Sequence, residues 1–416
     1  MGLDEGAGAL LRAWHERPTR AEPLYDLAKQ YRLAGMNRIA WMFANEAARI
    51  NKPDDILFVE EVVYDRGIDE ELSISAFYAG EKESGLAACE RLLANPRADH
   101  AQAKRNQVFY TNTIDVHRTV LDRLVPESLR TFDGVTYWCS NPSTCGEAIN
   151  VRLVNYQQEK GKRYWGHPDP GIIRTKNAII GPDKSVRILD DSILRSWNQH
   201  TRIFGLEDLR LFTFRDAIWF SATCCQEQGA NGNPRVVLGR VSKDLARVEH
   251  LVPLSWSGAN LIEKNWLLYA QDDELRAVYS FDPFTLLTGI NPDTGDVFAS
   301  TGNPVRWFAG RFRGSTSPVQ LKLGMGDVSL SIVHDVANFA EGNVYAHRFV
   351  LFNEKGVIMY SAPFFFEHAG VEYACGMTLR GDDLIISYGF EDREAKMIRL
   401  RAADVLTEMD RPPPER

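Results

Sequence analysis

Residues 235–254 read RVVLGRVSKDLARVEHLVPL, and this stretch decides the fold class. An apolar run meets a short polar turn, and a second apolar run follows it. This pattern is typical of two antiparallel strands joined by a turn. The same unit recurs along the second part of the chain, at 178–191, 275–290, 346–366 and 395–409.

A further pair of strand-like runs precedes each unit, as in LRLFTFRDAIWFSATCC at 209–225. The chain after residue 130 therefore holds about five units of ~50 residues, each long enough for a four-stranded blade. This repetition predicts a five-bladed β-propeller over residues 130–410. A β-sandwich is the alternative, but a recurring unit favours radial repetition.

Before residue 130 the pattern has a helical period. In PLYDLAKQYRLAGMNRIAWMFANEAARI, residues 23–50, small and apolar residues recur at steps of three and four, and Gly35 separates two runs. Residues 70–96 repeat this pattern around Gly80. Both segments resemble tetratricopeptide-type helical hairpins. We expect a tetratricopeptide-like domain over 1–124, and hence a mainly β protein with an α-helical N-terminal module.

Composition limits the functional classes. The chain has 416 residues, with 48 Lys and Arg against 56 Asp and Glu, and a net charge of −8. An acidic chain without a basic block is poorly suited to general nucleic-acid binding, although a local site for a small anion stays open. No apolar run has the length of a membrane span, and the N-terminus lacks the basic region of a secretory signal. Six cysteines without a CxxC pair indicate reduced thiols and predict a cytoplasmic protein.

Motifs for bound groups are absent from the sequence. We find no HExxH, no cysteine cluster and no Asp-rich calcium loop, so we expect no metal site. Neither a Walker loop nor a GxGxxG occurs, so we expect no nucleotide cofactor.

A propeller brings the inner strand of every blade to one axis, so polar residues at equivalent points of the units would converge. The candidates are Arg152, Asn155, Asp208, Arg210, Lys264, Arg313, His347 and Glu372. The sharpest run is GLEDLRLF at 205–212, where strand alternation would put Asp208 and Arg210 on one face and Glu207 on the other. This pair is either a salt bridge that locks a strand start or a general acid beside an anion-binding cation. The residues alone leave both interpretations open.

Two other candidates have equally plain structural alternatives. A histidine in an apolar strand, such as His334 or His347, is more often a core residue than a catalyst. Arg313 upstream of both raises the case for an anion site. Glu372 is either a buried structural acid or a second catalytic carboxylate.

The motifs GLEDLR, EKNW, FRGSTSP, YAHRF and VEYACG resemble those of five-bladed propellers that act on glycosidic bonds. The most similar are inverting β-1,2- and β-1,4-mannoside phosphorylases and their mannosyltransferase relatives. The resemblance runs from residue 135 onward, with Leu209 standing where the family usually has Pro. It implies that Asp208 is the general acid and that Arg210, Lys264, Arg313 and His347 bind an anion.

The N-terminal helices are similar to helical repeats attached to some bacterial glycosyltransferases, which implies transfer onto a larger acceptor. Phosphorolysis needs one carboxylate, because phosphate is itself the nucleophile, whereas a hydrolase needs two. We therefore expect an inverting enzyme that moves a glycosyl group, mannosyl by resemblance. It would act between a sugar phosphate, nucleotide sugar or phosphate and a hydroxyl of a glycan or other acceptor, with Arg152, Asn155 and Glu372 also binding substrate.

Two other classes stay open. One is a glycoside hydrolase that uses Asp208 and Glu372. The other is a non-catalytic propeller that binds a glycan or protein, with the helical module recruiting a protein partner.

Overall fold

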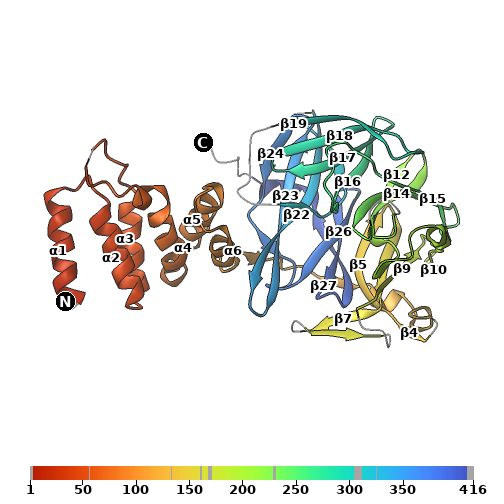
Figure 1. The fold of residues 1–416 in the computed structure, drawn as a ribbon, viewed down its shortest axis with the longest axis horizontal. Coiled ribbons are helices and arrows are strands. Elements are labelled where there is room, and N and C mark those ends of the chain that lie inside the picture. The colour runs from red at the N-terminus through yellow and green to blue at the C-terminus, as the bar shows by residue number, and fades with distance from the viewer. Residues whose placement is uncertain are drawn as a thin grey trace. The chain divides into compact units, whose positions relative to one another are not determined.

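The computed structural model describes residues 3–55, 57–132, 134–159, 162–166, 171–227, 231–303, 312–324 and 326–409. The chain divides into two compact units. The first contains the residues up to Asn112 together with Val336–Phe339, and the second begins at Thr113. We describe each unit by itself (Figure 1).

The first unit is an array of helices. Their bounds are α1 Leu3–Glu16, α2 Glu22–Leu33, α3 Asn37–Ala47, the π-helical turn η1 Val63–Gly67, α4 Ile68–Ala79, α5 Lys82–Ala94 and α6 His100–Val108. Gly35 and Gly80 adopt φ values of +76° and +85° at the two expected turns, which glycine tolerates without strain. The two predicted helical hairpins, α2–α3 and α4–α5, are thus confirmed, while their tetratricopeptide-like character stays a prediction.

The second unit consists of small, mainly antiparallel sheets, with β11 parallel to β9, and the strands of most of the sheets follow one another in sequence. One sheet has the order β10-β9-β6-β5, with β11 beside β9, and two others run β12 to β15 and β16 to β19. The bounds are β5 Trp138–Cys145, β6 Ala148–Val154, β9 Ile173–Ile180, β10 Val186–Ile188, β11 Ile203–Phe204, β12 Glu207–Phe214, β13 Ala217–Cys224, β14 Arg235–Val241, β15 Val248–Pro253, β16 Leu267–Gln271, β17 Glu274–Phe281, β18 Phe284–Ile290 and β19 Val297–Asn303.

Two further sheets contain the C-terminal strands. The order β1-β25-β23-β22-β20 is extended by β21 on β22 and by β24 on β23, and the last sheet runs β2-β28-β27-β26. The bounds are β1 Asn112–Thr113, β2 Arg118–Val120, β20 Arg313–Gly314, β21 Val319–Leu323, β22 Gly326–Phe339, β23 Gly342–Asn353, β24 Gly356–Tyr360, β25 Phe364–Phe365, β26 Glu372–Arg380, β27 Asp383–Phe390 and β28 Glu394–Arg401.

The remaining elements are short. The two-residue strands β3 Thr131–Phe132 and β4 Val135–Thr136 pair with each other, as do β7 Tyr156–Glu159 and β8 Lys162–Trp165. Single turns of 3₁₀ helix and one short helix complete the unit: η2 Asp122–Leu124, η3 Glu127–Leu129, η4 Ser192–Ser196 and α7 Ala402–Thr407.

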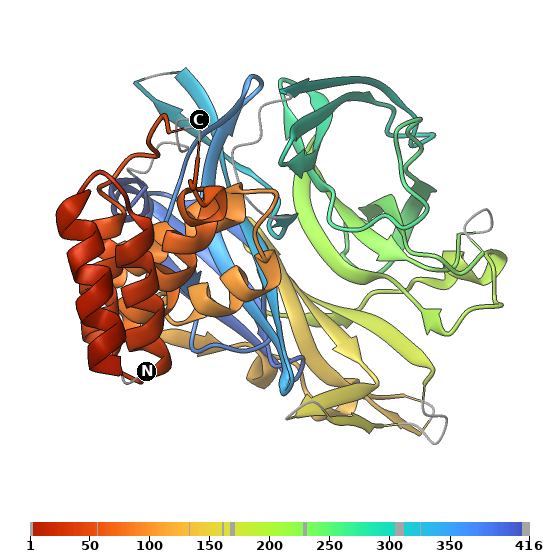
Figure 2. The same ribbon diagram turned by 60° about the vertical axis from the view of Figure 1, so that its left-hand side comes forward.

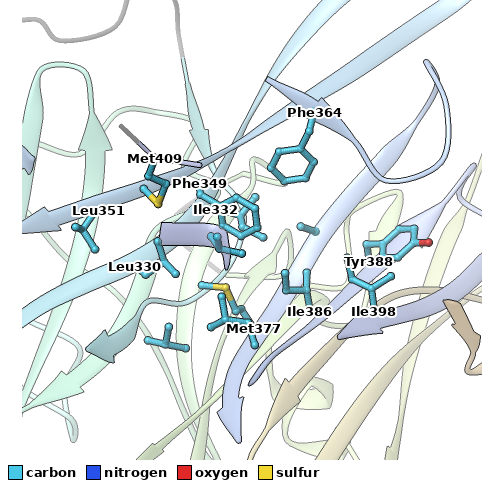
Figure 3. Close-up of a cluster of buried hydrophobic side chains, with 14 of the residues drawn as sticks. Leu330, Ile332, Phe349, Leu351, Phe364, Met377, Ile386, Tyr388, Ile398 and Met409 are labelled. Atoms are coloured by element: carbon cyan, nitrogen blue, oxygen red, sulfur yellow. The ribbon is translucent and has the colours of Figure 1, made fainter. Parts of the chain in front are cut away.

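Hydrophobic cores lie between neighbouring sheets. One cluster joins the β5 and β12 sheets, and another joins the β12 and β16 sheets. Phe281 and Phe284 pack on Phe352, with ring centroids 5.4 and 5.8 Å apart, and join the β16 sheet to the sheet of β22 and β23. A further cluster lies between the β22 and β26 sheets (Figure 3), and the last joins the β28 sheet to β5 and β6. The unit is therefore mainly β, with a propeller-like arrangement of small sheets (Figure 2).

Residues just after the helices complete the last sheet. Arg118–Val120, strand β2, pairs antiparallel with β28, so one sheet combines strands from both ends of the unit. We expected the helical domain to extend to residue 124, but Thr113 already belongs to the second unit. This boundary lies earlier than expected because β1 and β2 form backbone hydrogen bonds with strands from the C-terminal part of the chain.

Within the described residues, we find no helix with the combined length and apolar character that crossing a bilayer requires.

Candidate functional site

Strand β12 begins with a β-bulge at the motif GLEDLR. Glu207 and Arg210 pair with β13 residues only two positions apart, so Asp208 and Leu209 lie opposite a single residue. Asp208 has a φ of +50°, in the left-handed region that Asp tolerates better than most residues. The expected alternation is therefore wrong at this point. Glu207 and Asp208 do not point to opposite sides, because both contact the guanidinium of Arg152.

Arg152 of β6 links the two carboxylates. Its Nη1 donates to Asp208 Oδ1 at 2.8 Å, and its Nη2 donates to Glu207 Oε1 at 2.6 Å. Asn141 Nδ2 also donates to Asp208 Oδ1, at 2.8 Å. On the other side, Lys264 Nζ lies 3.7 Å from Glu207 Oε2. The Arg152 side chain is 6% exposed, whereas those of Asp208 and Lys264 are 20% and 42% exposed, so only the latter two reach solvent.

The charges around Asp208 keep it ionised. Burial alone would raise the pKa of its carboxyl group. The charges of Arg152 and Arg210, the hydrogen bond from Asn141 and the charge of Lys264 outweigh burial, and the pKa lies below its usual value. At neutral pH Asp208 is therefore a carboxylate that can accept a proton.

Arg210 is a buried cation, 2% exposed. Its Nε donates to the carbonyl of Ser315 at 2.7 Å, and its Nη2 donates to Asn265 Oδ1 at 2.9 Å and to the Tyr373 hydroxyl. Its Nη1 lies 3.4 Å from the backbone carbonyl of Asp208. In the described part of the chain no carboxylate forms an ion pair with it, so neutral groups hold its charge, which acts on Asp208 without direct contact between the two charged groups.

His334, rather than His347, adjoins this arginine network. Its Nδ1 lies 2.8 Å from the Ser315 hydroxyl, and its ring stacks on Tyr345 at a centroid distance of 5.5 Å. Burial, with smaller contributions from the charges of nearby groups including Arg313, holds the pKa of His334 well below its usual value. His334 is therefore neutral. Arg313 of β20 pairs through its backbone with His334 of β22, and its side chain is an exposed cation.

His347 lies in a hydrophobic environment. Its side chain is fully buried, its ring stacks on Phe364 and meets the edge of Phe366, and neither ring nitrogen has a hydrogen-bond partner among the described residues. Burial lowers its pKa to about 3. This geometry favours a neutral core residue over the anion-binding role that the resemblance implied.

Glu372 and Asn155 form hydrogen bonds with backbone groups of nearby segments. The buried Glu372 carboxylate accepts hydrogen bonds from three successive N–H groups of residues 366–368, at 2.7 to 3.1 Å. Burial raises its pKa to about 7. Asn155, also buried, donates to the Ile172 carbonyl and accepts from the Arg174 N–H, both at 2.8 Å. These contacts do not bring either side chain to the Asp208 network.

Sequence reasoning missed three residues of the site. Asn141 and Tyr373 hold Asp208 and Arg210, and Asp392 lies in the turn between β27 and β28. Burial, against the charge of Arg152, raises the pKa of Asp392. Strand alternation was the available signal for Tyr373, because it follows Glu372 and points to the opposite side of β26. Asn141 and Asp392 had no comparable signal.

Other candidate sites are weaker. No group of three or more His, Cys, Asp or Glu side chains is placed to hold a metal within the described ranges. A polar cavity of about 340 Å³ lies between the β16 and β22 sheets, lined by Tyr269, Gln271, Asp272, Asp327, Ser329, Asn353, Glu354 and Lys355. It shares no lining residue with the Asp208 network.

No protein-family model and no curated protein matches the sequence. Among solved structures, the chain is similar to a β-1,2-mannobiose phosphorylase from Listeria innocua, with 13% identity, a TM-score of 0.47 and coverage of 71% of this chain and 99% of the other. A glycosyl hydrolase from Bacteroides ovatus has 14% identity, a TM-score of 0.48 and coverage of 73% and 98%. A GDP-Man-dependent mannosyltransferase from Leishmania mexicana has 13% identity, a TM-score of 0.44 and coverage of 72% of this chain and 94% of the other. Because these similarities are low, we base the functional proposal on the geometry of the site.

Proposed function

We propose that the chain is an inverting glycosyl-transferring enzyme that works with phosphate or a phosphate-bearing sugar donor, with Asp208 as its single acid/base. One observation carries this proposal: a partly exposed carboxylate lies among Arg152, Arg210 and Lys264, and one of these cations, Arg210, is buried without an ion pair. With the exposed Arg313, four cations stand against the carboxyl groups of Glu207, Asp208 and Asp392 and leave a net positive charge, which suits a phosphate.

The ionised state of Asp208 indicates its role in each direction. In synthesis, the acceptor oxygen attacks C1 of the donor, the bond from C1 to the phosphate oxygen breaks, and Asp208 takes the hydroxyl proton. The phosphate leaves with the electron pair and is held by the cations. In phosphorolysis, phosphate attacks C1 and a protonated Asp208 gives its proton to the departing glycosidic oxygen. Bound phosphate, as a second negative charge, would raise the pKa of Asp208 and so favour its protonation.

The architecture belongs to the same proposal. We interpret the successive sheets, joined by shared cores and closed by β2 on β28, as the blades of a five-bladed propeller that forms the catalytic domain. We interpret the helices that end before Thr113 as a tetratricopeptide-like module that would dock a glycan acceptor or a protein partner. Six free cysteines support the proposed cytoplasmic location.

Hydrolysis by Asp208 and Glu372 is the alternative that the geometry disfavours. The Glu372 carboxylate is fully buried and accepts hydrogen bonds from three backbone N–H groups, so it is not exposed to a water or sugar. Besides Glu207, Asp392 is a carboxyl group whose charge interacts with that of Asp208. A hydrolase built on that pair would release free sugar without phosphate.

The test is a phosphate-dependence assay on β-linked mannosides, with the wild type and Asp208→Asn. We expect sugar 1-phosphate to appear only when phosphate is present, and turnover to fall by about 10²- to 10⁴-fold in Asp208→Asn with an unchanged melting temperature. Release of free mannose at the same rate without phosphate would favour the hydrolase. Full turnover by Asp208→Asn would overturn the assignment.

A further inference from the structure

The hairpin of β7 and β8 presents an aromatic and cationic face. Tyr156 pairs with Trp165 and Gln158 with Arg163, so these four side chains share one face of the two-stranded ribbon. Tyr164 belongs to the other face and is 49% exposed. The hairpin follows directly on β6, the strand that carries Arg152.

The shared face has a defined geometry. The rings of Tyr156 and Trp165 are 6.0 Å apart and tilted by 56°. The guanidinium carbon of Arg163 lies 4.4 Å from the centroid of Tyr156 and 5.5 Å from that of Trp165. Stacking on two rings fixes the planar guanidinium, whose remaining N–H groups can donate to a ligand. Arg163 is exposed and Trp165 is half-buried, so both are accessible.

The charges of this face interact with those of the Asp208 network. Burial raises the pKa of the Tyr156 hydroxyl, and the charges of Asp392 and Arg152 act on it as well. The charge of Arg163 in turn acts on Asp392, which also senses Asp208. The hairpin and the acid/base are therefore joined electrostatically through Tyr156 and Asp392.

We propose that this face of the β7–β8 hairpin is the subsite for a saccharide acceptor, an inference that rests on the proposed glycosyl transfer. The apolar C–H face of a pyranose packs against an aromatic ring such as Trp165, while its hydroxyls accept hydrogen bonds from Arg163 and Gln158. We assign a neutral ligand to this face because its two aromatic rings and the amide of Gln158 suit a saccharide. The phosphate belongs to Arg210 and Lys264 instead.

The test compares Trp165→Ala and Arg163→Ala with the matched control Tyr164→Ala, which removes an aromatic ring from the opposite face of the same hairpin. Isothermal titration calorimetry measures two titrants separately on the full chain: inorganic phosphate, and a panel of β-linked disaccharides of mannose, glucose and N-acetylglucosamine. We expect the disaccharide Kd to rise at least about tenfold in both test variants, which corresponds to the loss of one stacking contact or one charged hydrogen bond. The phosphate Kd should stay within about twofold, and Tyr164→Ala should change neither.

The two titrants separate failure of the subsite from failure of the proposed function. Equal disaccharide affinity in wild type, Trp165→Ala and Arg163→Ala overturns the subsite but leaves the phosphate site intact. No disaccharide binding to the wild type at millimolar concentration also overturns it. Absence of phosphate binding overturns the proposed function. Melting temperatures check folding, and the exposed Arg163 keeps the test decisive if Trp165→Ala unfolds.

Discussion

At the scale of single residues, Asp208 owes its chemistry to two independent features. A left-handed backbone conformation in a β-bulge places its carboxylate beside Glu207 rather than across the strand from it. Arg152 and Asn141 then hold one carboxylate oxygen with two hydrogen bonds, which leaves the other oxygen to solvent and substrate. A carboxylate held in this way loses little freedom when it reacts.

Four charged residues selected from the sequence lie close together in the structure, while their roles stay predictions. Asp208, Arg210, Arg152 and Lys264 lie in one network, because buried charges are stable only when they are paired or hydrogen-bonded. The sequence could not show that His347 would be enclosed by phenylalanines from distant strands. Its burial depends on side chains outside its own strand, and the residue pattern of one strand does not identify them.

Lys264 provides a test of the phosphate site without a folding defect. Lys264→Gln removes a half-exposed cation, 3.7 Å from Glu207 in a pair whose contribution to stability is small. We expect the KM for phosphate to rise by about tenfold, since a charged hydrogen bond to an anion contributes about 1.5 to 3 kcal/mol. Steady-state rates at varied phosphate concentration measure this change.

Lys176→Gln is the matched control. Lys176 is similarly exposed, but its Nζ pairs with Asp191 at 2.9 Å and does not contact the Asp208 network. Its phosphate KM should equal that of the wild type. A similar rise in both variants would mean that general surface charge, rather than a specific site, attracts phosphate.

At the scale of elements, bulges decide how the strands present the site. Register shifts occur in β5 between Ser140 and Ser143, in β12 between Glu207 and Arg210, and in β26 between Ala374 and Gly376. These three strands contact one another. Strand existence could be predicted from apolar runs, but each bulge moves side chains by one position, so alternation counted from the sequence fails where it matters most.

Gly389 of β27 tests how the neighbouring strand positions the acid. A Cβ on Gly389 would lie 2.0 Å from Asn141 Oδ1 and 2.8 Å from Asn141 N, distances that force Asn141 to move. Because Asn141 donates to Asp208, we expect Gly389→Ala to lower kcat by at least about tenfold and to cost about 1 to 3 kcal/mol of stability through overpacking. Kinetics and chemical denaturation measure the two effects.

Gly324→Ala serves as the comparison for this variant. Its added methyl group would meet nothing within 4 Å, so rate and stability should both stay near the wild-type values. If Gly389→Ala unfolds at the same denaturant concentration and reacts at the same rate as Gly324→Ala, contact between β27 and Asn141 does not position Asp208.

At the scale of the whole molecule, repetition was visible in the sequence because each strand pair has its own turn chemistry. The recurring unit at 235–254 corresponds to β14 and β15, the last two strands of one sheet, whereas the unit at 275–290 corresponds to β17 and β18, the two middle strands of the next. The pairing of Arg118–Val120 with β28 could not be foreseen, because the three-residue strand carries no pattern and its partner lies almost 300 residues away along the chain. Local periodicity therefore indicated the sheets, while their closure depends on contacts distant in sequence.

Two buried groups in the propeller-like unit give its stability a specific pH dependence. The pKa of His347 is lowered by burial to about 3, so its stabilising contribution is complete above pH 6.5 and declines as pH falls toward 3. The pKa of Glu372 is raised by burial to about 7, so its contribution is complete below pH 4.5 and declines as pH rises to 7. Between pH 4.5 and 6.5, the two groups therefore change the free energy of unfolding in opposite directions.

His347→Leu removes only the contribution of His347 to this pH dependence of the free energy of unfolding. The free energy of unfolding of the variant, compared between pH 5 and pH 7, should favour pH 5 by about 2 kcal/mol more than in the wild type, since 1.5 pH units at about 1.4 kcal/mol each are no longer lost. Urea denaturation at the two pH values measures this difference. His200→Leu, at an exposed position, should leave the wild-type difference unchanged. Parallel pH profiles for His347→Leu and the wild type would show that the imidazole is protonated in the folded chain, and hence that His347 remains available as a cation.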